Sequence, residues 1–155
     1  MAQKIIAENK RGLFNYEVLD KWQAGLKLSG FEVKSAKAGQ IDLKGSYVSL
    51  KIDKNHNQEA WLVGCHIAKY KKAGYGADGY EPTRPRKLLL NKKELSSLTG
   101  KIKQKGLTIL PISVYTSHGL VKLEIGLARG KKKYDKREAI KKREFDLRKQ
   151  KLVKN

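Results

Sequence analysis

The alternation of hydrophobic and polar residues divides most of the chain into short strands. It is clearest at 120–127, where Val121, Leu123, Ile125 and Leu127 share one face and Lys122 lies on the other. The same pattern, bounded by turn residues, predicts six strands in all, at 15–22, 46–52, 59–65, 87–90, 107–115 and 120–127. The chain is therefore expected to be built mainly of β-structure.

Two short helices are predicted between these strands. Each begins with a Ser or Asn followed three residues later by a Glu, which is the capping-box pattern: Ser29 with Glu32, and Asn91 with Glu94. The first helix should cover about residues 30–38. The second carries its leucines at helical spacing, so one face should pack against the sheet.

Together these elements predict a six-stranded antiparallel barrel of the OB-like kind, mainly β with short helices, although a β-sandwich of similar length fits the same periodicity. The strands at 46–52 and 59–65 flank a turn sequence and should form a hairpin. Pro111 lacks a backbone donor, so it predicts an edge or a bulge in the strand at 107–115.

The charge is strongly positive and unevenly distributed. The 155 residues include 35 Lys and Arg against 15 Asp and Glu, a net charge of +20. Segment 130–155 has 12 basic and 4 acidic residues, or +8, and the other 129 residues carry +12. We therefore predict a barrel domain at 1–129 and a basic C-terminal tail at 130–155. Such charge favours a polyanionic partner, either nucleic acid or an anionic membrane.

Several classes of protein are disfavoured. No segment approaches the ~18 apolar residues that span a bilayer, and the tail lacks a broad apolar face for membrane binding. The single cysteine, Cys65, fits a reducing, cytoplasmic location and is expected to be a small buried hydrophobe. The neighbouring His66 should point to the opposite face of its strand. No spacing indicates catalytic residues, a metal site or a cofactor site, so no enzymatic activity is expected.

Three basic segments favour nucleic acid. The first is a polar arm before the first predicted strand, which could instead be a frayed terminus: Asn9, Lys10 and Arg11. The second could bind phosphates and stack bases, or could simply be a solubilising loop: Arg84, Arg86 and Lys87, beside Tyr75 and Tyr80. The third is the tail, which could be a disordered basic extension; its spacing of Asp135 and Glu138 also predicts a helix start.

These local patterns, in order, resemble those of the SsrA-binding protein (SmpB) family. The resemblance covers the chain from about Ile6 to the tail. It is carried by these segments: Asn9-Lys10-Arg11, Ala24-Gly25, Gly30-x-Glu32-Val33-Lys34-Ser35, Ala38-Gly39, Ser46-Tyr47-Val48, Pro82-x-Arg84-x-Arg86-Lys87-Leu88-Leu89-Leu90, Lys105-Gly106, Gly130-Lys131-Lys132 and Tyr134-Asp135-Lys136-Arg137.

The resemblance implies an OB-like barrel that binds the tRNA-like domain of transfer-messenger RNA (tmRNA). It also implies a tail that enters the decoding centre and empty messenger channel of a stalled ribosome, against small-subunit rRNA. Elongation factor Tu would be an indirect partner through the charged RNA. The complex would then allow trans-translation, which rescues the ribosome and tags the nascent chain for proteolysis.

By position, the resemblance also implies roles for individual residues. The RNA-facing side of the barrel would include Asn9, Lys10, Arg11, Lys34 and Lys37. Leu89 and Asn91 match a stretch important for RNA binding, although Leu89 could be core and Asn91 a helix cap. The decoding-centre tail would comprise Lys131, Lys132, Lys133, Tyr134, Asp135, Lys136 and Arg137.

The chain departs from the family pattern at two places. Gln23 stands where the family usually has glutamate, so a charge is lost there while hydrogen bonding is kept. Ala36-Lys37 replaces the usual Leu-Arg, and lysine cannot make the bidentate contacts of arginine. Two other functions remain open from the residues alone: a structural ribosomal protein and an RNA-processing enzyme.

Overall fold

Strands are the most abundant secondary structure in the computed structural model, which describes residues 3–70, 79–131 and 140–148. Nine strands lie within these residues: β1 (Lys4–Glu8), β2 (Tyr16–Leu26), β3 (Ile41–Asp42), β4 (Tyr47–Ile52), β5 (Gln58–Val63), β6 (His66–Ile67), β7 (Arg86–Leu89), β8 (Leu107–Ser117) and β9 (Leu120–Gly130). Seven form one sheet in the order β1-β8-β9-β2-β7-β5-β4, and β3 pairs with β6 in a second sheet. Every pair is antiparallel.

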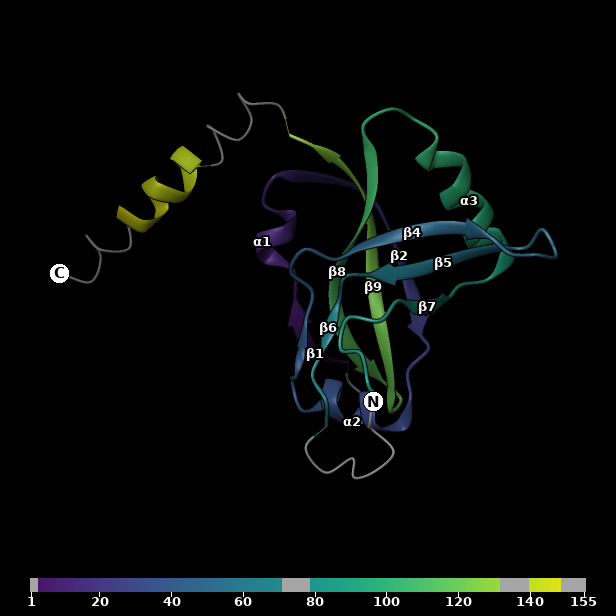
Figure 1. Ribbon diagram of the computed structural model, residues 1–155. Helices are drawn as coiled ribbons and strands as arrows, with labels where there is room; N and C mark the ends of the chain where they lie inside the picture. Colours follow the sequence, from purple (N-terminus) through teal and green to yellow (C-terminus); the bar gives the residue numbers. More distant parts are fainter. Residues whose placement is uncertain (1–2, 71–78, 132–139, 149–155) are drawn as a thin grey trace.

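The large sheet curls into a half-closed barrel. The β4–β5 hairpin crosses in front of the long strands β2, β8 and β9 (Figure 1). Although β4 and β8 lie near opposite ends of the strand order, they also contact each other. This contact brings the two ends of the sheet together, as expected for the strong twist of an antiparallel sheet.

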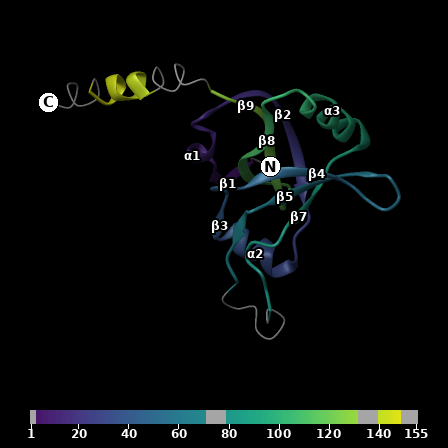
Figure 2. The same cartoon turned by 45° about the horizontal axis from the view of Figure 1, so that its top comes forward.

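Three short helices accompany the barrel: α1 (Lys10–Leu13), α2 (Gly30–Lys37) and α3 (Lys92–Ile102). In two views, α2 and α3 lie at opposite ends of the barrel (Figures 1 and 2). Residues 140–148 are also helical, and all their side chains are exposed. None of the helices in the described residues is long and apolar enough to cross a bilayer.

The core lies between the concave face of the sheet and the helices. The alternation in β9 buries Val121, Leu123, Ile125 and Leu127 on this face. Leu98, which is fully buried, anchors α3 at one end of the barrel. The remaining buried apolar residues of the core are Ala24, Leu26, Ala36, Ile41, Leu43, Val48, Ala60, Leu62, Cys65, Ile67, Leu88, Ile109 and Val114.

The longest hairpin, β8–β9, has a tight turn that suits the twist of its strands. His118 and Gly119 both have positive φ, at 52° and 77°, which is characteristic of a type I′ turn. Farther along β8, the pairing with β9 shifts register between Pro111 and Ser113. The bulge predicted at Pro111 is therefore present, although β8 is an inner strand of the sheet and not an edge.

The predicted mainly-β architecture is confirmed, but the number of strands was wrong. All six predicted strands are present, as β2, β4, β5, β7, β8 and β9, and both capped helices form. The three missed strands are β1, β3 and β6. Two of these, β3 and β6, have only two residues each, which is too short for any alternation to be visible. Part of the predicted basic arm is helical, as α1.

Candidate nucleic-acid interface

The convex face of the sheet carries an apolar groove beside β7. Register pairs Gly25 of β2 with Leu89 of β7 on one side and with Lys122 of β9 on the other. Leu89 is 53% exposed, so its alternative interpretation as a core residue is wrong. The groove has a volume of about 290 Å³ and is bordered by Val33 of α2 and Leu120 of β9. It offers an apolar floor with a cation at its edge.

Gly25 leaves room for Leu89 in this groove. A Cβ at position 25 would lie 3.1 Å from the Leu89 Cβ atom, closer than most side-chain contacts. Any larger residue would therefore push Leu89 aside. The absent side chain also keeps the sheet surface open for a ligand to approach the backbone.

A polar cluster lies next along β2, centred on Gln23. Its Nε2 donates to Glu124 Oε2 across the β2–β9 pairing at 2.8 Å, and the Tyr115 hydroxyl donates to its Oε1. Lys21 Nζ lies 3.8 Å from the same Glu124 carboxylate. Burial and the charge of Glu124 raise the pKa of Tyr115, so its hydroxyl remains a donor at neutral pH. Gln23 lacks the negative charge of the glutamate that is usual at this position. A carboxylate is nevertheless present beside it, because Glu124 lies directly opposite on β9.

Asn91, predicted either to bind RNA or to cap a helix, caps α3. Its side chain accepts from the Glu94 backbone N at 2.8 Å, and the Glu94 carboxylate accepts from the Asn91 backbone N at 3.1 Å. The residue is exposed and lies two positions beyond Leu89. It therefore sets the direction in which the chain leaves β7 at the edge of the groove.

Asn9, predicted to contact RNA, is directed inward. It is 4% exposed; its Nδ2 donates to the Pro111 carbonyl at 2.8 Å and its backbone N to the Ile112 carbonyl at 2.9 Å. Asn9 therefore cannot contact a ligand on the surface, and the prediction that it binds RNA is wrong. Its hydrogen bonds instead connect the segment after β1 to β8. Lys10 and Arg11, the other two residues of this predicted segment, point outward from the protein.

Replacing Asn9 with alanine should reduce stability without affecting RNA affinity. The change leaves the Pro111 carbonyl without its partner, so we expect a loss of about 1–3 kcal/mol in the free energy of unfolding, measured in urea. Lys10→Ala serves as a control on the next residue, whose side chain is 86% exposed, and should change stability by less than about 0.5 kcal/mol. Equal stability of the two variants would contradict the structural role assigned to Asn9.

Arg86 is also buried, contrary to its predicted role in phosphate binding. It is 0% exposed, and its Nη2 donates to Glu32 Oε2 at 2.8 Å. Its Nε donates to the same Glu32 oxygen at 3.0 Å, and its Nη1 donates to the Cys65 carbonyl. Its Nη2 also donates to the Pro82 carbonyl and to the Tyr80 hydroxyl, each at 2.9 Å. The alternation of β7 explains this placement: Arg86 and Leu88 face inward, whereas Lys87 and Leu89 face outward.

Glu32 is the partner that makes the burial of Arg86 possible. Burial by itself would raise the pKa of Glu32, but hydrogen bonds from Arg84, Ser29 and Arg86 outweigh it and lower the pKa to about 2. The carboxylate is therefore ionised throughout the neutral range. It also caps α2, so a single residue joins this helix to the segment leading into β7.

The other predicted basic residues remain accessible to different degrees. Arg84 donates to Glu32 but keeps 39% of its side chain exposed, and Lys87, at 38%, lies 3.4 Å from the Glu59 carboxylate. Lys34 and Lys37 are exposed on α2. Tyr80, expected to offer a stacking surface, instead directs its hydroxyl inward to the Ile67 carbonyl at 2.9 Å. Tyr75 lies outside the described residues.

Comparison with known proteins places the chain in a family. The family model described as SmpB protein matches residues 6–155. This chain belongs to the SmpB family. A curated relative called SsrA-binding protein, from Sulfurihydrogenibium sp. (strain YO3AOP1), is 48% identical over 94% of this chain and 91% of the relative. Another of the same name, from Trichodesmium erythraeum (strain IMS101), is 44% identical over 98% and 94%.

A solved structure is also similar to this SmpB-family chain. One of its chains is 42% identical and superposes with a TM-score of 0.64, covering 86% of this chain and 93% of that one. The structure is described as "tmRNA-SmpB: a journey to the center of the bacterial ribosome".

Only the first residue of the predicted SmpB-type tail motif is described. β9 ends at Gly130, and the Lys131 backbone N then donates to the Asn15 carbonyl at 2.9 Å. The Lys131 ammonium lies 5.8 Å from the centre of the Phe14 ring. The rest of the motif, Lys132 to Arg137, lies outside the described residues. The chain is therefore fastened to the body up to Lys131.

Sequence reasoning missed several residues on the convex face. Trp61 of β5 and Lys27, which follows β2, lie beside Lys87, and Lys122 lies beside Gly25. Alternation along 59–65 could have assigned Trp61 to the outer face, since Ala60 and Leu62 are buried. No pattern in the sequence could have paired β5 with β7, because strand order depends on tertiary structure.

Proposed function

We propose that this chain binds tmRNA and delivers it to stalled ribosomes for trans-translation. The observation that carries the proposal is the groove around Leu89: an exposed leucine in the middle of a sheet, beside Gly25 and Lys122, within a body of strongly positive charge. Large apolar residues on an open face indicate a binding surface. The name SsrA-binding protein of the relatives and the description of the similar structure, which names tmRNA with SmpB, support tmRNA as its partner.

In this proposal, different parts of the molecule have different tasks. The tRNA-like domain of tmRNA packs on the convex face, where Lys122 and the outward lysines Lys34, Lys37 and Lys87 can meet phosphates. Lys10 and Arg11 extend this basic surface at α1. The protein acts in the cytoplasm as a binding factor and not as an enzyme.

The tail is proposed to act on the ribosome. The decoding-centre motif Lys131 to Arg137 would enter the decoding centre and the empty messenger channel of the small subunit. The exposed helix at 140–148 supports this, because it holds four cations against two carboxylates and buries nothing against its own barrel. Elongation factor Tu takes part through the charged RNA, without a contact assigned on this chain.

Replacing Leu89 with serine tests the proposed RNA face. We expect tmRNA affinity to fall about 10- to 100-fold, the loss that follows when a buried apolar contact is removed from a complex. The free energy of unfolding should change by less than about 1 kcal/mol, since the free side chain is mostly exposed. Gel-shift titration and urea unfolding measure the two quantities.

Ile52→Ser is the matched control. Ile52 is an aliphatic residue at the end of β4 that is 70% exposed and lies outside the groove. This variant should bind tmRNA within about twofold of the original protein, as surface changes away from an interface generally do. If both variants lost affinity equally, the Leu89 groove would not be the RNA site.

A further inference from the structure

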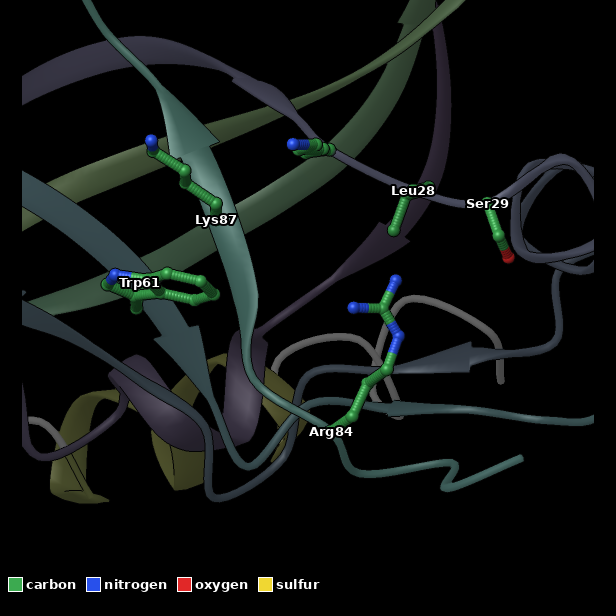
Figure 3. A pocket seen from close by; sticks show the side chains of 6 residues that line it. Leu28, Ser29, Trp61, Arg84 and Lys87 are labelled. Carbon is green, nitrogen blue, oxygen red and sulfur yellow. The ribbon is translucent and has the colours of Figure 1, made fainter. Parts of the chain in front are cut away.

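A second groove on the convex face lies at the junction of β5, β7 and the segment between β2 and α2. It has a volume of about 340 Å³ and is lined by Lys27, Leu28, Ser29, Trp61, Arg84 and Lys87. Trp61 and Lys87 lie on one side, Leu28 and Ser29 on the other, and Arg84 reaches in between (Figure 3). The Lys27 backbone N donates to the Lys87 carbonyl at 3.0 Å, which fixes the two lysine-bearing segments side by side.

Trp61 is held rigidly in the wall of this groove. Its indole Nε1 donates to Glu59 Oε2 at 2.9 Å, and the Lys51 ammonium lies 5.8 Å from the ring centre. Both contacts orient a ring that is only partly buried. A fixed, partly exposed aromatic ring is a ready surface for stacking, because little conformational entropy is lost when a second ring packs on it.

The groove has a surplus of positive charge. None of the six described residues that line it is acidic, and three are cations, of which Lys87 is paired with the Glu59 carboxylate. Arg84 shares the Glu32 carboxylate with Arg86, so two guanidinium groups are opposed by one negative charge. Because Arg86 is fully buried and Arg84 is not, the uncompensated charge is available at Arg84. The surplus favours an anion in the groove.

We infer that this groove takes one unpaired nucleotide of an RNA strand, with the base stacked on Trp61 and a phosphate held by Lys27, Arg84 and Lys87. A fixed aromatic ring beside clustered cations is the combination that recognises a base and its phosphate. Bases inside a duplex present no free face, so the nucleotide must be unpaired. The inference rests on the proposed function: Lys87 and Leu89 share the outward face of β7, so one RNA can reach both grooves.

Tryptophan fluorescence reports on the groove directly. The chain has two tryptophans, so Trp22→Phe leaves Trp61 as the only one. We expect single-stranded hexa-adenylate to quench this emission saturably, and a duplex of equal phosphate number to bind at least about tenfold more weakly at this site. Absence of quenching, equal quenching by the duplex, or equally tight binding of free adenosine monophosphate would overturn the inference.

Affinity for tmRNA gives an independent test in the full-length chain. Trp61→Leu should weaken binding about 5- to 100-fold, the range for loss of one base–aromatic stack, whereas Trp61→Phe should keep most of the affinity. Lys27→Gln should weaken binding, and Lys54→Gln, a control in the exposed β4–β5 turn, should not. If the original protein selects tmRNA but all four variants bind equally well, the inference fails and the proposed function stands. If the original protein shows no selection, the proposed function fails.

Discussion

Replacing Glu32 with glutamine is expected to destabilise the protein by about 3–5 kcal/mol. The variant keeps the shape of the side chain but leaves Arg86 buried without a counter-charge, and losing one partner of a buried ion pair costs about this much. It also replaces one of the two acceptor oxygens, which together bind Arg84 and the Ser29 backbone N at the start of α2, with an NH2 group that cannot accept. Urea or thermal unfolding followed by circular dichroism measures the loss.

Glu81→Gln is the matched control for this variant. Glu81 is an exposed carboxylate near Arg84 that bonds only to Thr83 among the described residues. Its replacement should leave the free energy of unfolding nearly unchanged. If Glu32→Gln were no more destabilising than Glu81→Gln, the buried ion pair would not be holding this segment in place.

The lowered pKa of Glu32 predicts how the stability of the protein depends on pH. The pKa of Glu32 is about 2 in the folded protein, below its ordinary value of 4.5, so its ionised form favours folding. This contribution is complete above about pH 4.5 and is lost as the pH falls towards 2. It amounts to about 3 kcal/mol, and the difference in stability between the original protein and Glu32→Gln should shrink over that pH range.

Removing residues 132–155 is expected to abolish tagging on stalled ribosomes while leaving tmRNA binding within about tenfold. The barrel face proposed to hold the RNA remains intact, whereas the segment proposed to enter the decoding centre is lost. Lys131 is kept because its backbone bonds to Asn15 and its ammonium lies over the Phe14 ring. Gel-shift titration measures binding, and a tagging reaction on ribosomes stalled without a stop codon measures rescue.

The deletion also removes positive charge, and the effect of this loss on RNA binding must be distinguished from a specific role of the tail on the ribosome. The deletion removes 11 basic and 4 acidic residues, so the net charge falls from +20 to +13 and nonspecific affinity for any RNA should drop. Tyr134→Ala, which leaves the charge unchanged, should reduce tagging more than binding. If either change impaired tmRNA binding as strongly as tagging, the division between barrel and tail would be wrong.

The sequence predicted most of the β-structure because its strands alternate strictly where one face is buried. β9 is the clearest case, and the capping pairs at Ser29 and Asn91 likewise fixed both longer helices. Alternation cannot reveal a strand of two residues such as β3, nor can it show that β4 curls back to contact β8. Those features depend on which strands pair in space.

The candidate site was predicted less well because residue type does not show which way a side chain points. Arg84, Arg86 and Lys87 look equivalent in sequence, yet Arg86 is paired with Glu32 in the interior. The Glu32 carboxylate was recognised as a helix cap, but its second role requires a partner 54 residues away. Asn9 was misjudged for the same reason, since its acceptor at Pro111 lies 102 residues away.

The central claim is that the barrel selects tmRNA over other polyanions. The most direct measurement is titration of the full-length protein into labelled tmRNA at about 150 mM salt, with bulk tRNA and then heparin as competitors, because phosphate contacts alone weaken steeply with salt. We predict that tmRNA is bound at least about 100-fold more tightly than either competitor. Displacement of tmRNA by an equal concentration of either competitor would contradict the account.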